Sequence, residues 1–466
     1  MVRIEKDSLG EVRVPSNVYY GPQTVRATQN FPISGDTLPH SFIKAQAAIK
    51  LAAAKANREC GVLLDPLITK SIIDSALEIR SGKYLDQFVV DVFQAGAGTS
   101  QNMNMNEVIA NLALERMGFD KGRYDIIHPN DHINMSQSSN DTIHSAMHVS
   151  IVELTHLKLL PVIDEMLTIL DEIISENNTI VKPGRTHLQE AVPITLGQEF
   201  SGYFRSIELA KNRIESALTD LLELNLGGSA VGTGINVPRG FSSIALKEIR
   251  LITGHEFRLT KNRFEATQTA GSALTFSAAL RGLAVELIKI SNDIRLLASD
   301  PRTSIGELSL KAVQPGSSIM PGKVNPAMPE MMNMVCFQVI GNDGATVVAS
   351  QAGQLELNVF TPIITHNILR SLEILSNAIK VFNINCLRGL KANSKRCEEL
   401  MNNSLSIATV LAPKLGYDRV AEIVQKANRE NKSIKSIVME LGIMSEDELD
   451  DSLDPLKVTR SMNDTT

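Results

Sequence analysis

Long stretches in which apolar residues recur at helical spacing dominate this chain, and they constrain its fold more than any other feature. From Ser138 onwards, apolar side chains return every three or four residues. The pattern continues beyond Pro161, which we expect to kink this helix without ending it. Similar patterns mark residues 195–226, 267–298 and 362–387. Helices of about 30 residues are far longer than average, so the sequence predicts a mainly α fold with a long central helical bundle.

The helix expected directly after residue 326 is apolar on several sides. Its segment MMNMVCFQVIG, residues 331–341, has no consistently polar face. A helix of this kind must be covered on more than one side. We therefore expect further copies of the chain to cover part of it.

The length of the chain allows a large core and more than one domain. It has 466 residues, no Trp, few other aromatics and abundant residues that suit packed helices. The first part is mixed and punctuated by Pro and Gly, and the last part is charged, with shorter helical patterns. We predict an N-terminal domain over residues 1–137, a central helical-bundle domain over 138–390 and a small helical C-terminal domain over 391–466.

Charge and cysteine usage exclude several classes of protein. The formal net charge is −6, and no basic stripe runs through the chain, so nucleic acid is not expected as a partner. The first ten residues, MVRIEKDSLG, do not resemble a signal peptide, and no uninterrupted apolar run is long enough to cross a membrane. The cysteines form no C-x-x-C pair; they are Cys60, Cys336, Cys386 and Cys397. A cytoplasmic protein with reduced thiols is expected.

Four polar segments punctuated by glycine interrupt the helical patterns. They are residues 96–108 (GAGTSQNMNMNEV), 128–141 (HPNDHINMSQSSND), 184–189 (GRTHLQ) and 316–326 (GSSIMPGKVNP). Each lies beside a helix end, and helix N-termini attract anions through free N–H groups and the helix dipole. Their hydroxyl and amide donors would suit carboxylates; these are Thr99, Ser138, Ser139, Asn140 and Thr186.

Structural interpretations compete with each of these functional ones. Ser and Asn at helix starts often only cap the helix. A lone histidine such as His187 is more often structural than catalytic. The i,i+4 pair His128 and His132 lies near no thiolate and is separated by Pro129, so a metal site is not expected.

Residues 316–326 carry the strongest functional signal. Glycine allows the backbone to approach a ligand closely, while Pro321 and Pro326 reduce the entropy lost when the loop is ordered. Lys323 supplies a positive charge, and Asn325 supplies directional donors. Ser317 would act as a base only if neighbouring N–H groups and Lys323 depressed its pKa strongly.

The segment GSSIMPGKVNP resembles the signature loop of the fumarase/aspartase superfamily. SQSSND, GRTHLQ and GGSAVGTG support the resemblance, which extends over nearly the whole chain. It implies a helical homotetramer with a multi-helix core, in which each active site gathers segments from three subunits. It also implies an elimination that yields fumarate, a small dicarboxylate substrate, and no metal or organic cofactor.

The resemblance also implies roles for individual residues. Ser317 would be the base, and His187, oriented by Glu330, would act on the opposite side of the substrate. The residues expected to bind substrate are Ala97, Gly98, Thr99, Ser138, Ser139, Asn140, Thr186, Ser318, Lys323, Val324 and Asn325. A second anion site would comprise His128, Pro129, Asn130 and Asp131, although Asp125 stands where fumarases often have a basic residue.

The leaving group distinguishes the two main branches of the superfamily. SQSSND and GGSAVGTG favour water, as in a fumarate hydratase that interconverts fumarate and (S)-malate within the tricarboxylic acid cycle. GAGTS favours ammonia, as in an aspartate ammonia-lyase, because fumarases usually place serine where Ala97 stands. A non-catalytic helical scaffold is a third hypothesis, disfavoured by the presence of Ser317, Lys323, Asn325, His187 and Glu330.

Overall fold

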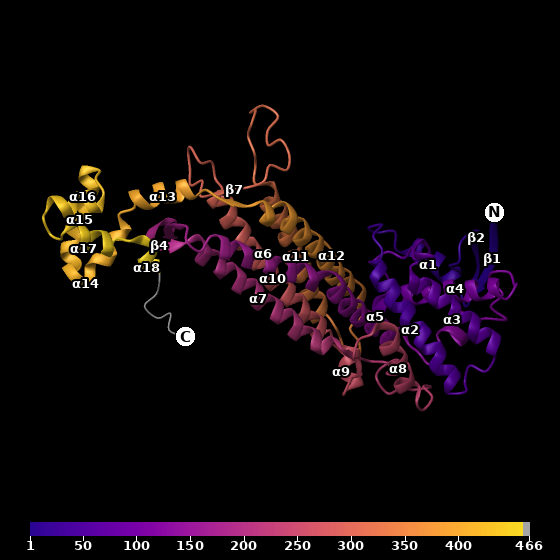
Figure 1. The fold of residues 1–466 in the computed structure, drawn as a ribbon. Coiled ribbons are helices and arrows are strands. Elements are labelled where there is room, and N and C mark those ends of the chain that lie inside the picture. Colours follow the sequence, from indigo (N-terminus) through magenta and orange to yellow (C-terminus); the bar gives the residue numbers. More distant parts are fainter. Residues whose placement is uncertain (460–466) are drawn as a thin grey trace. The chain divides into compact units, whose positions relative to one another are not determined.

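Helices make up most of the computed structural model, which describes residues 1–459 (Figure 1). Within these residues, the strands form four two-stranded sheets. The chain divides into two units that are discontinuous in sequence. The first comprises Met1–Pro161, Lys211–Ala284 and Cys336–Ser376, and the second comprises Val162–Ala210, Val285–Val335 and the residues from Asn377 onwards. The predicted mainly α fold is confirmed, and the predicted domain boundaries stay predictions.

The first unit begins with a β-hairpin followed by four helices. Strands β1 (Val2–Asp7) and β2 (Gly10–Pro15) pair antiparallel, and helices α1 (Pro22–Asn30), α2 (His40–Glu59), α3 (Pro66–Ser81) and α4 (Thr99–Arg116) follow. Local sequence explains the ends of α3. The Asp65 side chain accepts hydrogen bonds from the N–H groups of Leu67 and Ile68, and Gly82 ends the helix with a left-handed φ of 103°.

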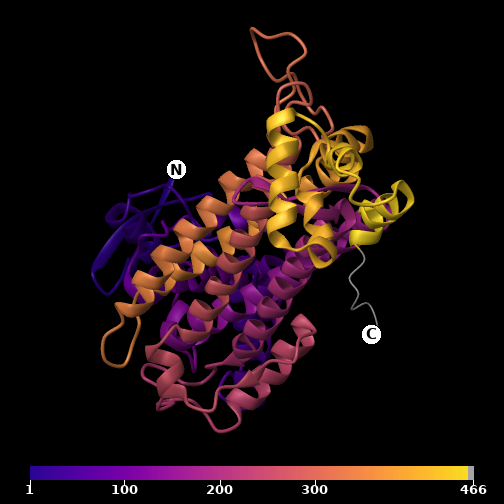
Figure 2. The same ribbon diagram turned by 90° about the vertical axis from the view of Figure 1, so that its left-hand side faces the viewer.

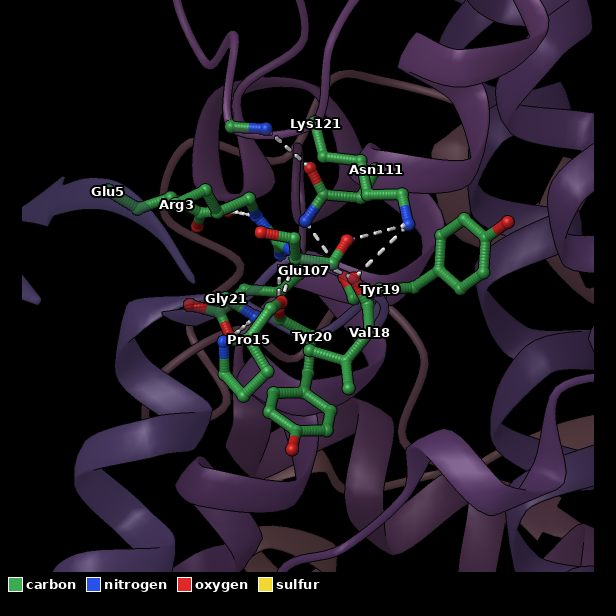
Figure 3. Close-up of polar contacts among 12 residues, drawn as sticks. Arg3, Glu5, Pro15, Val18, Tyr19, Tyr20, Gly21, Glu107, Asn111 and Lys121 are labelled. Atoms are coloured by element: carbon green, nitrogen blue, oxygen red, sulfur yellow. Dashed lines mark hydrogen bonds and ion pairs between the residues drawn. The ribbon is translucent and has the colours of Figure 1, made fainter. Parts of the chain in front are cut away.

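A buried polar network anchors the hairpin and α1 to α4 (Figure 3). The Glu107 carboxylate accepts hydrogen bonds from the N–H groups of Gly21, Gln23 and Thr24, and from the Thr24 hydroxyl at 2.7 Å. It therefore caps the N-terminus of α1 from a neighbouring helix. Arg3 donates to the carbonyl oxygens of the chain leading to α1, namely those of Pro15, Val18 and Tyr20.

The bundle portion of the first unit is tied by polar contacts between long helices. It contains α5 (Ser139–Leu154) and parts of α7 (Leu196–Leu221), α10 (Gly271–Leu297), α11 (Ala327–Gln351) and α12 (Thr361–Asn385). The Ser277 hydroxyl and the Arg281 guanidinium of α10 both donate to Asp343 of α11. Asn342 of α11 donates to the Ser371 hydroxyl of α12 at 3.0 Å.

The second unit continues the same helices and adds small elements. Tyr203 of α7 donates to Asp293 of α10 at 2.8 Å, and Asn383 of α12 donates to the Val162 carbonyl of α6 (Leu160–Glu176) at 3.0 Å. Strands β3 (Val181–Thr186) and β4 (Gln189–Thr195) form a hairpin, and β7 (Leu308–Ser309) pairs with β8 (Lys391–Ala392). The long helices can be followed in both views (Figure 1, Figure 2).

The end of the described chain has its own small core. Its helices are α13 (Ser394–Asn403), α14 (Ala412–Leu415), α15 (Tyr417–Glu430), α16 (Ile434–Glu440), α17 (Glu446–Ser452) and α18 (Pro455–Thr459). Leu411, Ile423, Ile437 and Leu449 are fully buried there.

The predicted long helices are present, with differences at their ends. A π-helical turn, Thr155–Leu159, ends two residues before Pro161, and the helix continues through this proline as α6. The helix predicted over 195–226 ends at Leu221, because Glu223–Leu224 (β5) pairs with Arg258–Leu259 (β6). Residues 267–268 belong to a separate helix, α9 (Arg263–Gln268), which ends where Thr269 becomes extended. Between these segments lies α8 (Phe241–Thr253).

One helix in residues 1–459, Ser139–Glu176, is long and apolar enough to span a bilayer by length and composition. Its most apolar window is 67% buried by protein, as in the core helix of a bundle.

Candidate functional site

In the first unit, the start of α5 combines capping with contacts to a distant turn. Ser138 caps the helix, since its hydroxyl accepts from the Asn140 N–H, and its own N–H donates to Asp141 at 2.9 Å. Asn140 Nδ2 donates to the Ala230 carbonyl at 2.7 Å, and the Ser229 N–H donates to Asp141 at 3.0 Å. The structure therefore joins the motifs SQSSND and GGSAVGTG.

Gly228 leaves no space for a side chain inside this turn. A Cβ on Gly228 would lie 2.5 Å from Asn225 Oδ1, and Ser229 adopts a left-handed φ of 58°. A bulkier residue at position 228 would therefore collide with the Asn225 side chain.

The segment 96–99 lies beside the same helix start. Ala97 has a left-handed φ of 55°, and its N–H donates to the Val359 carbonyl at 2.8 Å. One small cavity is lined by three of the predicted site residues, Ala97, Ser139 and Asn140. The other residues that line it are Ile143, His144, Met147, Thr267, Thr269, Ala270, Leu357, Asn358 and Thr361. Thr99 and Ser138 do not line this cavity, and the Thr99 hydroxyl donates to the Gly96 carbonyl at 3.2 Å.

The predicted second anion site forms a π-helical turn, Pro129–Ile133, in the first unit. His128 Nδ1 accepts from the N–H groups of Asn130 and Asp131, both at 3.2 Å, so it caps this turn. Arg123, the nearby cation in sequence, forms an ion pair with Asp125 at 2.7 Å. The site stays a prediction.

In the second unit, His187 lies at the tip of the hairpin β3–β4. His187 and Leu188 both have left-handed φ angles, 54° and 60°, as in a two-residue hairpin turn. Thr186 and His187 are exposed, so the imidazole points to solvent within this chain.

Buried charges hold the base of this hairpin. Lys182, 1% exposed, pairs with Glu199 at 2.8 Å and with the buried Glu307 at 2.9 Å. Arg185 pairs with Glu307 at 2.7 Å. Because Glu307 directly precedes β7, it connects the hairpin with the segment that leads to loop 316–326.

Loop 316–326 lies between β7 and α11. The Ser317 hydroxyl oxygen accepts from the backbone N–H groups of Ile319 at 3.2 Å and Met320 at 3.0 Å. Such donors stabilise negative charge on an oxygen, as an alkoxide base requires. Ser318, Lys323 and Val324 are exposed, and Ser317 and Asn325 are half-buried.

A cavity of about 760 Å³ in the second unit contains the C-terminal part of this loop. Lys323, Val324, Asn325 and Glu330 line it, but Ser317 and Ser318 do not. Glu330 lies 3.7 Å from the Arg295 guanidinium, and Arg295 lines the same cavity. No sequence motif marks Arg295, because a single arginine within a helical pattern gives no local signal.

The candidate residues thus fall into separate groups by unit. The first unit contains the segments around Ala97, His128 and Ser139, and the second contains those around His187 and Ser317. Within residues 1–459, no group of three or more His, Cys, Asp or Glu side chains is arranged to hold a metal ion. All four cysteines are free thiols.

Comparison with known proteins adds independent information. A family model described as "Lyase" matches residues 10–341, and one described as "Fumarase C C-terminus" matches residues 407–460. The fumarate hydratase class II of Thermosynechococcus vestitus is 47% identical over 448 residues, which cover 96% of each chain. An aspartate ammonia-lyase of Bacillus sp is 45% identical over 458 residues, which cover 98% of this chain and 97% of that protein.

A solved structure agrees with these sequence matches. The class II fumarase of Schistosoma mansoni superposes with a TM-score of 0.95 at 36% identity, over 99% of this chain and all of the other. Hydratase and ammonia-lyase relatives are almost equally similar, so overall identity does not separate the two activities. Because the lyase model covers most of the chain and these relatives span nearly its full length, the chain belongs to the fumarase/aspartase superfamily and is a lyase.

Proposed function

We propose that this lyase is a fumarate hydratase, which adds water to fumarate to give (S)-malate by anti addition and catalyses the reverse elimination. The main support is the contact between the SQSSND helix start and the GGSAVGTG turn. Asn140 donates a hydrogen bond to the Ala230 carbonyl, and Asp141 accepts one from the Ser229 N–H. These are the two motifs whose residue types favour water over ammonia. Their contact supports the proposal that both belong to one site.

The difficult step is removal of the malate C3 proton, which is only weakly acidic. The resulting dianionic aci-carboxylate needs preorganised donors and cations. Ser317 takes the proton in this proposal, supported by the two N–H groups that point at its oxygen. Lys323 and Asn325, on the same loop, hold the carboxylate on which charge develops.

The hydroxyl leaves from the opposite side of the substrate. His187, exposed at its hairpin tip, delivers the proton that makes the leaving group water. Glu330 is assigned to orient His187 from another subunit, since within the chain its carboxylate lies beside Arg295. The donors around Thr99, Ser139, Asn140 and Thr186 bind the two carboxylates.

Self-association is part of the proposal, as a homotetramer whose sites draw on several subunits. Apolar side chains on α11 support it, because Met334, Phe337 and Val348 are 64%, 58% and 59% exposed. They lie on one face of α11 together with Gly341 and Gly344, at helical spacing. Such an exposed apolar face is typical of a contact surface between subunits.

Aspartate ammonia-lyase is the second candidate. Ala97 favours it, because this residue lines the cavity beside Ser139 and Asn140 and brings no hydroxyl there. The proposal also keeps the expectations of a cytoplasmic location, a role in the tricarboxylic acid cycle and action without metal or organic cofactor.

The test follows fumarate by its ultraviolet absorbance in purified protein treated with a chelator. Fumarate should be consumed without ammonium, and (S)-malate should yield fumarate. Consumption only in the presence of ammonium, with fumarate formed from L-aspartate, would replace the hydratase by the ammonia-lyase. No turnover in either direction would favour a non-catalytic scaffold.

A further inference from the structure

A buried polar chain links Lys50 of α2 to Ser139 at the start of α5. Lys50 is 1% exposed, and its ammonium donates to Asn134 Oδ1 at 2.9 Å. Asn134 Oδ1 also accepts from Asn102 Nδ2 at 3.0 Å. The same Asn102 nitrogen donates to the Ser139 hydroxyl oxygen at 3.0 Å. All four residues belong to the first unit.

Lys50 determines which group donates and which accepts in each of these three hydrogen bonds. A protonated lysine has donors only, so the Asn134 amide must present its oxygen to it. Asn134 Nδ2 is turned to the Gln137 carbonyl at 3.2 Å, which agrees with that orientation. Asn102 must then present its nitrogen to Asn134, and the same nitrogen faces Ser139.

Unpaired oxygens show that this orientation is imposed. Asn106 Nδ2 also donates to Asn134 Oδ1, at 3.3 Å. Within the described residues, Asn102 Oδ1 and Asn106 Oδ1 are buried and have no hydrogen-bond partner. Leaving a buried acceptor unpaired costs free energy. Both amides nevertheless direct their nitrogens at Asn134 and leave their own oxygens unpaired, so this orientation is imposed by Asn134.

The consequence reaches the candidate substrate. A serine hydroxyl has one proton and two lone pairs. Because the Ser139 oxygen accepts from Asn102, its proton points away from Asn102, toward the side where Ser139 and Asn140 line a small cavity. A substrate carboxylate bound beside Ser139 would receive that proton as a hydrogen bond.

We propose that Lys50 is a positioning residue which, through Asn134 and Asn102, holds the Ser139 hydroxyl as a hydrogen-bond donor to a substrate carboxylate. This inference rests on the proposed dicarboxylate-binding function, and no sequence motif suggested it. Lys50 does not touch the substrate.

The electrostatic surroundings of Lys50 agree with this role. Burial lowers the pKa of Lys50 to about 7, and the Asp141 carboxylate of α5 opposes that shift. Burial likewise raises the pKa of Asp141 to about 6. A dianion bound at the start of α5 favours the charged form of Lys50, which is the form that has donors only.

The test measures binding of succinate, a dicarboxylate with no leaving group and no double bond, to the full-length protein by calorimetry. Lys50→Met should weaken binding about 10- to 100-fold, the range expected for losing one hydrogen bond to a charged group. Lys50→Gln keeps a donor without the charge and should restore most of the affinity. The control Lys55→Met, on the same helix but paired with Glu248 at 2.7 Å, should bind as the wild type does.

A double-mutant cycle separates positioning from general damage. If Lys50 acts through Ser139, then Lys50→Met should weaken binding little further in a Ser139→Ala background. In turnover, Lys50→Met should raise KM more than it lowers kcat. If Lys50→Met does not fold, a comparison of Lys50→Gln with Ser139→Ala still tests the proposal. The Lys50→Gln variant should bind succinate at least about tenfold more tightly than the Ser139→Ala variant.

The outcomes distinguish this inference from the proposed function. Equal succinate affinity in wild type and Lys50→Met, or full additivity with Ser139→Ala, overturns the role of Lys50 alone. Absence of succinate binding by the wild type overturns the dicarboxylate site, and this inference with it.

Discussion

Asn325 Nδ2 donates a 2.7 Å hydrogen bond to the carbonyl of Gly316 and so closes the neck of loop 316–326. The Gly316 N–H donates to the Lys323 carbonyl at 2.9 Å across the same neck. Together these bonds give a flexible segment a defined shape. Asn325 thus has a structural task in addition to its proposed contact with substrate.

The neck leaves no space for a side chain on Gly316. A Cβ there would lie 2.3 Å from the Lys323 carbonyl oxygen and 2.9 Å from the Asn325 nitrogen, both backbone atoms. We expect Gly316→Ala to open the neck and to lower kcat about tenfold or more, since misplaced catalytic groups are costly. Its thermal midpoint should stay close to that of the wild type.

The matched control is Gly271→Ala at the start of α10, where a Cβ meets no atom within 4 Å. It should retain full turnover. Normal kcat in Gly316→Ala would show that the closed neck is unimportant for catalysis.

The proposed base gives a direct prediction. Ser317→Ala removes the oxygen that accepts from Ile319 and Met320. We expect kcat to fall by about 10²- to 10⁴-fold, the usual contribution of a general base, with KM changed far less. Steady-state rates of fumarate formation from malate, at several concentrations, measure both constants. Unchanged turnover would exclude Ser317 as the base.

The network in Figure 3 predicts a strict need for glycine at position 21. A Cβ on Gly21 would lie 2.4 Å from the Tyr124 hydroxyl and 2.9 Å from both Glu107 and Glu5. Gly21→Ala should destabilise the protein by about 1–3 kcal/mol, as overpacking does. Urea unfolding measures the change.

A second glycine serves as its control. Gly202→Ala lies within α7, where the new Cβ meets nothing within 4 Å, and should be neutral or stabilising by up to about 1 kcal/mol. Equal effects of the two substitutions would contradict the steric account of Gly21.

Glu107 predicts a pH dependence of stability. Burial outweighs four hydrogen bonds and raises the pKa of Glu107 from 4.5 to about 7. A raised pKa in the folded state means that this group favours folding most below pH 4.5, and that its contribution falls as the pH rises through about 7. The loss is on the order of 1.4 kcal/mol per unit of pKa shift.

The isosteric variant Glu107→Gln cannot ionise and isolates this effect. The free energy of unfolding of the wild type minus that of the variant should decrease from pH 4.5 to pH 7. Urea titrations of both proteins across this range provide the measurement. A difference that is constant or increases with pH would show that Glu107 remains ionised throughout.

Residue pattern alone predicted the long helices and marked loop 316–326 as a candidate site. Helical spacing predicted the continuous helix through Pro161 because burial of an apolar stripe is a local, periodic requirement. It could not predict the π-helical turn Thr155–Leu159, nor the early end of α7 at Leu221, where Glu223–Leu224 pairs with a strand more than 30 residues away. The sequence made Ser317, Lys323 and Asn325 candidates because a rigid turn explains the glycines and prolines of the loop but not a lysine beside two serines.

Only the tertiary structure showed what surrounds these residues. The bonds from Asn140 to Ala230 and from Lys50 through Asn134 and Asn102 to Ser139 join segments 30 to 90 residues apart, and no local pattern encodes them. The ion pair between Arg295 and Glu330 likewise could not be predicted from a local pattern, because the role of a single arginine in a helix depends on the side chain that it contacts. Short-range periodicity specifies elements, whereas the direction of a buried hydrogen bond depends on every partner that packing brings to it.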